Sequence, residues 1–128
     1  MVPWSLLCAT QFRDLSLCLA RGRFGVTLAP IGCKLQPIDV REVAGVLVAA
    51  ATSAPAKRLG DVAGPDVVPF SELARAWRRA AGRRGWAVPV LALGATAAFL
   101  RSGKLCRPDR AVGTITFAAW LAERYPAC

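Results

Sequence analysis

Two carboxylates three positions apart, Asp39 and Glu42, are the residues of this chain whose types and spacing most invite a chemical role. They belong to the segment Gln36-Pro37-Ile38-Asp39-Val40-Arg41-Glu42-Val43-Ala44. Pro37 favours extended geometry at Gln36, and Asp39 can accept hydrogen bonds from the first free N–H groups of a helix. Glu42 can reach back to the amide of Asp39, as in a capping box. Helix capping therefore accounts for both carboxylates, and a direct chemical role for either is the less favoured alternative.

The composition offers little for metal chemistry. The chain has no His and five Cys, at positions 8, 18, 33, 106 and 128, with no CxxC pair. A zinc site therefore lacks its usual ligands. Cys8 and Cys18 lie in apolar runs, where cysteine packs as a small hydrophobe. The odd number and irregular spacing favour reduced thiols and a cytoplasmic setting.

The charge is strongly positive, with a net value of +9 from 14 Arg and 3 Lys against 8 acidic residues. The only local cluster is Arg75, Arg78, Arg79, Arg83 and Arg84. Most of it falls on the polar face and C-terminal end of one predicted helix, where the helix dipole favours cations. Since no nucleic-acid-binding motif accompanies the charge, we expect no nucleic-acid partner. A basic interaction module that uses this face is kept as an alternative.

Apolar patterning predicts strands that alternate with helices, which indicates an α/β fold. The Trp4–Ala9 run predicts a strand buried on both faces of a parallel sheet. Further extended segments are expected at 26–28, 35–38, 58–63 and 88–91, and helices at 14–19, 40–51, 70–81, 95–101 and 116–124. The helix at 40–51 has an apolar stripe at helical spacing: Val40, Val43, Ala44, Leu47, Val48 and Ala51. The 128 residues suit one domain with a hydrophobic core.

No segment predicts membrane insertion or export. The longest uncharged stretch, residues 85–100, contains Pro89 and Gly94 and is shorter than the roughly 20 residues that cross a bilayer. The apolar start has no basic n-region and is interrupted by Arg13 and Asp14, which excludes a typical signal peptide.

Several segments together resemble one protein family over nearly the whole chain. Pro3-Trp4-Ser5-Leu6-Leu7-Cys8-Ala9-Thr10-Gln11-Phe12 is similar to the strand after the active-site helix in atypical, NmrA-like short-chain dehydrogenase/reductases, which commonly ends Arg-Ala-Thr-Gln-Phe. The segment at 36–44 resembles the family's Gln-Pro-Val-Asp-Val-Arg-Glu-Val-Ala almost residue for residue. Gly64-Pro65-Asp66-Val67, Glu72-Leu73-Ala74-Arg75-Ala76, Gly82-Arg83-Arg84, Ala111-Val112-Gly113, Thr116-Phe117 and Leu121-Ala122-Glu123-Arg124 continue in family order.

The resemblance implies the C-terminal part of a Rossmann-type, NAD(P)-binding fold with a small helical substrate lobe. Residues 1–63 would supply later Rossmann strands and helices, and residues 64–128 the substrate lobe. In relatives, the exit of the first strand lies beside the nicotinamide and a small-molecule substrate, at the C-terminal ends of the strands. The resemblance therefore makes Ala9, Thr10, Gln11 and Phe12 the cofactor- and substrate-adjacent candidates, and Gln36, Asp39 and Glu42 the residues of a structural junction. The alternative is that Thr10 and Gln11 only satisfy loop backbone groups and that Phe12 belongs to the core.

The Gly-rich loop that cradles a dinucleotide pyrophosphate does not occur in these 128 residues. The Tyr-x-x-x-Lys pair of many relatives is also missing. We therefore expect the later strands of a parallel sheet without the Gly-rich N-terminal half, and doubtful NAD(P) binding by this chain alone. The unpaired edge of the Trp4–Ala9 strand would favour self-association.

Three hypotheses follow. The first is part of an NAD(P)-dependent oxidoreductase that is inactive alone, and it is the preferred one. The second is an NmrA-like regulator that binds a dinucleotide without turnover. The third is the basic interaction module.

Overall fold

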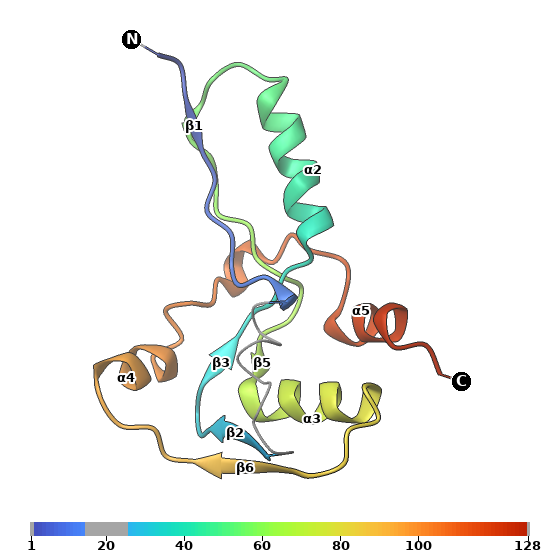
Figure 1. Cartoon of the computed structure of the whole chain (residues 1–128). Coiled ribbons are helices and arrows are strands. Elements are labelled where there is room, and N and C mark those ends of the chain that lie inside the picture. The colour runs from blue at the N-terminus through green and yellow to red at the C-terminus, as the bar shows by residue number, and fades with distance from the viewer. Residues whose placement is uncertain (1, 15–25, 128) are drawn as a thin grey trace.

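The computed structural model of the protein describes residues 2–14 and 26–127, which form a mixed α/β structure (Figure 1). The elements in chain order are β1 (Ser5–Leu6), β2 (Val26–Pro30), β3 (Lys34–Leu35), α2 (Val40–Ala51), β4 (Lys57–Arg58), β5 (Val68–Pro69), α3 (Phe70–Ala80), β6 (Trp86–Val90), α4 (Ala95–Arg101), the 3₁₀ turn η1 (Pro108–Arg110) and α5 (Phe117–Arg124). The helix expected at 14–19 falls almost entirely outside the described residues.

The strands pair two by two. Within the described residues, β1 runs parallel to β4, β2 runs parallel to β6, and β3 is antiparallel to β5. The prediction that Trp4–Ala9 is buried on both faces is wrong, because Trp4 is 52% and Leu6 48% exposed. Only Ser5 and Leu6 form a ladder, and β4 is the single described strand beside them. A neighbouring strand pairs with an edge of β1 and covers neither of its faces.

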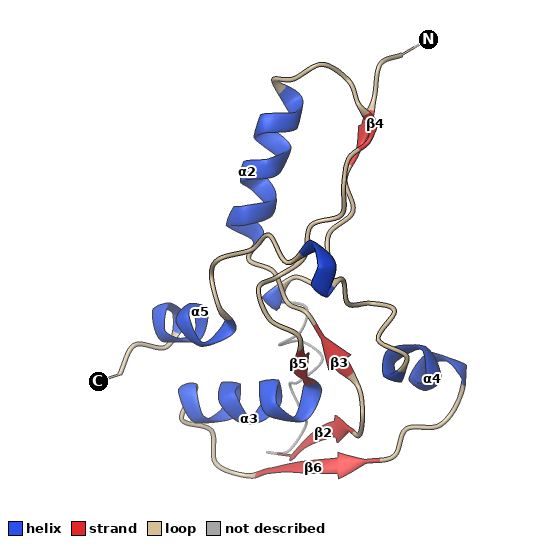
Figure 2. Ribbon diagram, turned by 180° about the vertical axis from the view of Figure 1, so that it is seen from behind, coloured by secondary structure: helices blue, strands red, loops and turns tan. Residues whose placement is uncertain are grey.

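The main core lies between α3, α5 and the strands β2 and β3. Its buried members are Ala29, Cys33, Leu35, Phe70, Leu73, Ala74, Trp77, Phe117, Trp120 and Leu121. The sequence predicted that Trp77 and Trp120 pack in the core, and both are buried. Figure 2 shows this body from behind, with α3 close to β2 and β6.

Helix α3 agrees with its predicted span to within one residue. Pro69 stands at its N-cap without a side-chain cap bond, and Gly82 follows its end with a φ of 62°. The expectation that Arg78 lies on the solvated face is wrong, because this residue is buried. Arg78 borders the apolar stripe, so its stem packs inward while its guanidinium donates to Thr27 Oγ1 over 2.8 Å.

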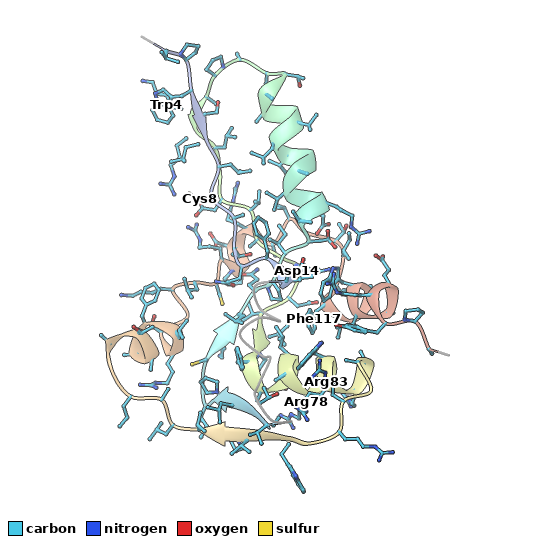
Figure 3. All side chains as sticks on the ribbon, viewed as in Figure 1. Trp4, Cys8, Asp14, Arg78, Arg83 and Phe117 are labelled. Carbon is cyan, nitrogen blue, oxygen red and sulfur yellow. The ribbon has the colours of Figure 1, made fainter. Side chains whose placement is uncertain are left out.

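Helix α2 has the predicted bounds but not the predicted packing. With β1 and β4 it forms an arm that extends away from the body, and Trp4 and Cys8 lie along this arm (Figures 1 and 3). Of its apolar stripe only Val43 is buried, whereas Leu47 is 50% and Val48 66% exposed. A second, small core cluster holds the arm: Ile38, Val43 and Val62, with Leu7 and Val46 packed against it.

The helices of residues 2–14 and 26–127 include none with the length and apolar content of a bilayer span.

The main core is larger than the small cluster of the arm, so shortening an apolar side chain should cost more stability in the body than in the arm. We expect Leu73→Ala to lower the free energy of unfolding by about 2–5 kcal/mol, because Leu73 is fully buried in the main core. Leu47→Ala removes the same atoms from an exposed site and should change it by no more than about 0.5 kcal/mol. Urea unfolding followed by circular dichroism measures both. Equal losses would contradict this assignment of the core.

Candidate functional site

Three extended segments converge where the arm joins the body. Thr10 N donates to Val62 O over 3.0 Å, and Ile38 N donates to Gln11 O over 2.9 Å. Single parallel bridges join Ala9 to Val62 and Phe12 to Ile38. The segments after β1, β3 and β4 therefore run side by side in the same direction, and their C-terminal ends meet.

The side chains of Thr10, Gln11 and Gln36 link these ends. Thr10 Oγ1 donates to Gln36 O over 2.6 Å and accepts from Gly64 N over 3.3 Å. Gln11 Oε1 accepts from Gln36 N over 3.2 Å, while Gln11 Nε2 donates to Leu105 O over 3.3 Å. The side chains of Thr10 and Gln11 thus bond to backbone groups, as the structural alternative expects.

Gln36 is fully buried and completes the network. Its Nε2 donates to Gly64 O over 2.8 Å and to Arg107 O over 3.3 Å. Its Oε1 accepts from Arg107 N over 2.6 Å. Each polar atom of this amide has a backbone partner, which is the arrangement that a buried polar group requires.

A small hollow of about 220 Å³ lies at the strand ends. Ala9, Thr10 and Gln11 line it together with Lys104 and Arg107. Phe12 does not line it, and at 40% exposure it does not belong to the core either. Sequence reasoning missed the two cations, because they arrive from a loop about 95 residues later in the chain.

The two cations of the hollow differ in their availability. Arg107 pairs with Asp61 at 2.5 Å and with Asp109 at 3.0 Å. These partners, Asp109 first, raise the pKa of Arg107, whose charge is already balanced. The exposed Lys104 ammonium pairs with no carboxylate among the described residues. The hollow can therefore hold an anionic or carbonyl oxygen at Lys104.

Asp39 is a cap, as predicted, and also the anion of a buried ion pair. Its Oδ1 accepts from Arg41 N over 2.8 Å at the start of α2. Its Oδ2 lies 3.4 Å from Arg13 Nη1 and 2.8 Å from Arg41 Nη2. Arg13 is 1% and Asp39 2% exposed. The side-chain bond from Arg41 is the main cause that lowers the pKa of Asp39, and burial opposes it.

Glu42 does not complete a capping box, so that prediction is wrong. Its Oε1 accepts instead from Thr114 N over 2.6 Å, Thr114 Oγ1 over 2.8 Å and Ile115 N over 3.2 Å. Arg13 also donates to Ile115 O. The backbone N–H groups of Thr114 and Ile115 face the first turn of α2, and Glu42 accepts from them instead of from the amide of Asp39. The predicted junction therefore anchors the C-terminal segment as well.

Nothing in residues 2–14 and 26–127 forms a group of three His, Cys, Asp or Glu that could hold a metal ion.

The buried ion pair predicts a pH-dependent effect of Asp39→Asn. Breaking a buried pair leaves the Arg13 charge uncompensated, which costs about 3–5 kcal/mol at pH 7. Because folding lowers the pKa of Asp39, its stabilisation is complete above the unfolded value of about 3.9 and is lost as the pH falls through the folded value. We expect the gap between wild type and variant in urea unfolding to narrow from pH 7 to pH 3. Asp66→Asn, an exposed matched change, should show no such gap, and a gap independent of pH would contradict the assignment.

The close approach at Gly64 predicts that a methyl group is not tolerated there. A Cβ at Gly64 would overlap Pro37 O, while a Cβ at Gly45 in α2 would meet nothing within 4 Å. Gly64→Ala should destabilise the protein by about 1–3 kcal/mol through overpacking. Gly45→Ala should stabilise it by about 0.5–1 kcal/mol, because alanine is the better helix former. Thermal unfolding of both variants checks the contrast, and a neutral Gly64→Ala would show that the strand ends do not pack this closely.

In comparisons with known proteins, no family model and no curated protein matches this sequence. A functional proposal for the chain therefore depends on its own residues and their geometry.

Proposed function

We propose that this chain is the substrate-side, C-terminal portion of an NAD(P)-dependent oxidoreductase of the short-chain dehydrogenase/reductase superfamily, and that it does not turn over substrate alone. The observation that carries the proposal is the parallel course of three segments, two of which (8–11 and 61–62) line one hollow where they end. In open α/β sheets, ligands bind outside the carboxyl ends of parallel strands. The hollow lies at such ends.

The motif residues support the same proposal. Thr10, Gln36 and Gly64 belong to three separate segments that resemble the NmrA-like proteins, and they bond to one another. If the similarity came only from common helix caps and turns, its residues would not be expected to bond to one another across three segments. The proposed role of Ala9, Thr10 and Gln11 is to border the substrate, and that of Lys104 to hold its negatively charged or carbonyl oxygen.

The hollow is small, as expected if this chain does not contain the dinucleotide-binding part of the site. At about 220 Å³ it lies below the roughly 300–1,000 Å³ of typical small-molecule pockets. The cofactor would need a Gly-rich loop from a further polypeptide segment. Such a segment could cover the exposed side of α2 and the edge of β1 that pairs with no described strand.

A dinucleotide-binding regulator is the second candidate. Thr10 and Gln11 are held by backbone bonds, and no histidine or tyrosine lines the hollow. The described lining is thus better supplied with positioning groups than with groups that exchange protons near neutral pH. This favours binding without turnover.

NADPH fluorescence titration tests the proposal. The titration uses the chain with Arg75→Gln and Arg79→Gln, so that the exposed arginines of α3 do not hold the nucleotide. We expect no saturable micromolar binding by this chain alone, and saturable binding after a folded N-terminal half with an intact GxxGxxG loop, from an NmrA-like protein, is added. The same half with its loop glycines replaced by alanine is the control. NADPH consumption by the assembled pair with candidate substrates supports the oxidoreductase, and binding without consumption supports the regulator. Micromolar binding by the chain alone, or none by two well-folded halves, contradicts the proposal.

A further inference from the structure

A second, larger hollow lies along α3 and is lined by arginines. Its volume is about 670 Å³, and Arg75, Arg78, Arg79 and Arg83 contribute to its wall. It shares no lining residue with the hollow at the strand ends. Figure 3 labels Arg78 and Arg83 beside α3, together with Phe117, which lines the same hollow.

The end of α3 brings the arginines together. Arg75 and Arg79 are four residues apart and share one face of the helix. Gly82, with a φ of 62°, turns the chain, so that Arg83 N donates to Arg78 O over 2.9 Å. This is the six-to-one hydrogen bond of a Schellman turn. The turn places the Arg83 guanidinium 5.4 Å from the ring centroid of Trp77.

Arg78 is fixed at the base of the cluster. Its Nη1 donates to Thr27 Oγ1 and its Nη2 to Arg84 O, each over 2.8 Å. A buried guanidinium held at two points contributes a charge whose position does not depend on solvent. The Arg78 charge is therefore in place before any ligand arrives.

The exposed arginines of this hollow carry more charge than its described lining balances. Arg75, Arg79 and Arg83 line it together with one described carboxylate, that of Glu72. In the part of the chain that the structure describes, no ion pair involves Arg75, Arg79 or Arg83. Like charges at i,i+4 destabilise a helix, and a concave surface of one sign concentrates counter-ions. An anion between these side chains would relieve the repulsion.

The rest of the wall is apolar and includes Val68, Ala76 and Phe117. The volume falls in the range of small-molecule pockets, about 300–1,000 Å³. Guanidinium groups match phosphate geometry with paired hydrogen bonds. We propose that this hollow binds a phosphate-bearing small molecule of nucleotide size, with the phosphates at Arg75, Arg79 and Arg83 and the organic body against the apolar wall. The site is independent of the proposed oxidoreductase function.

Isothermal titration of the full chain with ADP and with pyrophosphate, at low and at physiological salt, tests the proposal. We expect saturable one-to-one binding of both that weakens with salt, with ADP the tighter because its nucleoside covers apolar surface. Arg75→Gln and Arg79→Gln change exposed side chains, and each should weaken ADP binding about tenfold or more. Arg84→Gln is the matched control: it removes an exposed neighbouring charge that does not line the hollow.

Other outcomes would overturn the proposal. Absence of saturable binding would show that the hollow holds no nucleotide. Equal weakening by Arg84→Gln would show that only the net positive charge attracts the anion. Tighter binding of a 20-base-pair DNA duplex than of ADP, reduced alike by all three substitutions, would assign the arginines to a nucleic-acid surface instead. The far-ultraviolet circular dichroism of each variant shows whether it is folded, and the two exposed positions test the site separately.

Discussion

The buried ion pair between Arg13 and Asp39 is the constraint on which the rest of this structure depends. Burial lowers the pKa of Arg13, but Asp39 and Glu42 oppose the shift, and a guanidinium stays protonated in proteins. The charge must therefore be met by partners at fixed places. Asp39 supplies the anion from the start of α2, and Ile115 supplies a carbonyl from the segment before α5. The Arg13 side chain thus joins the segment after β1, the start of α2 and the segment before α5.

This junction links two parts of very different apolar content. The body has a core with two buried tryptophans, whereas the arm is held by a cluster of three buried residues. Since few apolar contacts hold the arm, directed polar contacts do much of the positioning. The Gln36 network and the Glu42 bonds to Thr114 and Ile115 have this role. The small number of apolar contacts in the arm agrees with the exposed apolar side of α2, which no described element covers.

Local signals predicted the helices well. The spans of α2, α3, α4 and α5 agree to within one residue with the helices expected at 40–51, 70–81, 95–101 and 116–124. Asp39 is the expected cap of α2, whereas Thr116, which was expected inside the last helix, is the cap of α5. The candidate site was predicted in part. Ala9, Thr10 and Gln11 line the hollow, but Phe12 does not, and Lys104 and Arg107 were not foreseen. Their arrival depends on the path of a distant loop, which leaves no local pattern in the sequence.

The sequence by itself determined where helices begin and end, because capping and periodicity act over a few neighbouring residues. It also determined the α/β class and the excess of arginine. Only the tertiary structure decided which partner each polar group takes. Glu42 bonds to Thr114 rather than to its own helix, and Arg78 is buried with its guanidinium bonded to Thr27 of β2. Arg75, Arg79 and Arg83 line one hollow in which the only described carboxylate is that of Glu72. Such pairings form between groups that are distant in the chain, so their geometry exists only after the chain has folded.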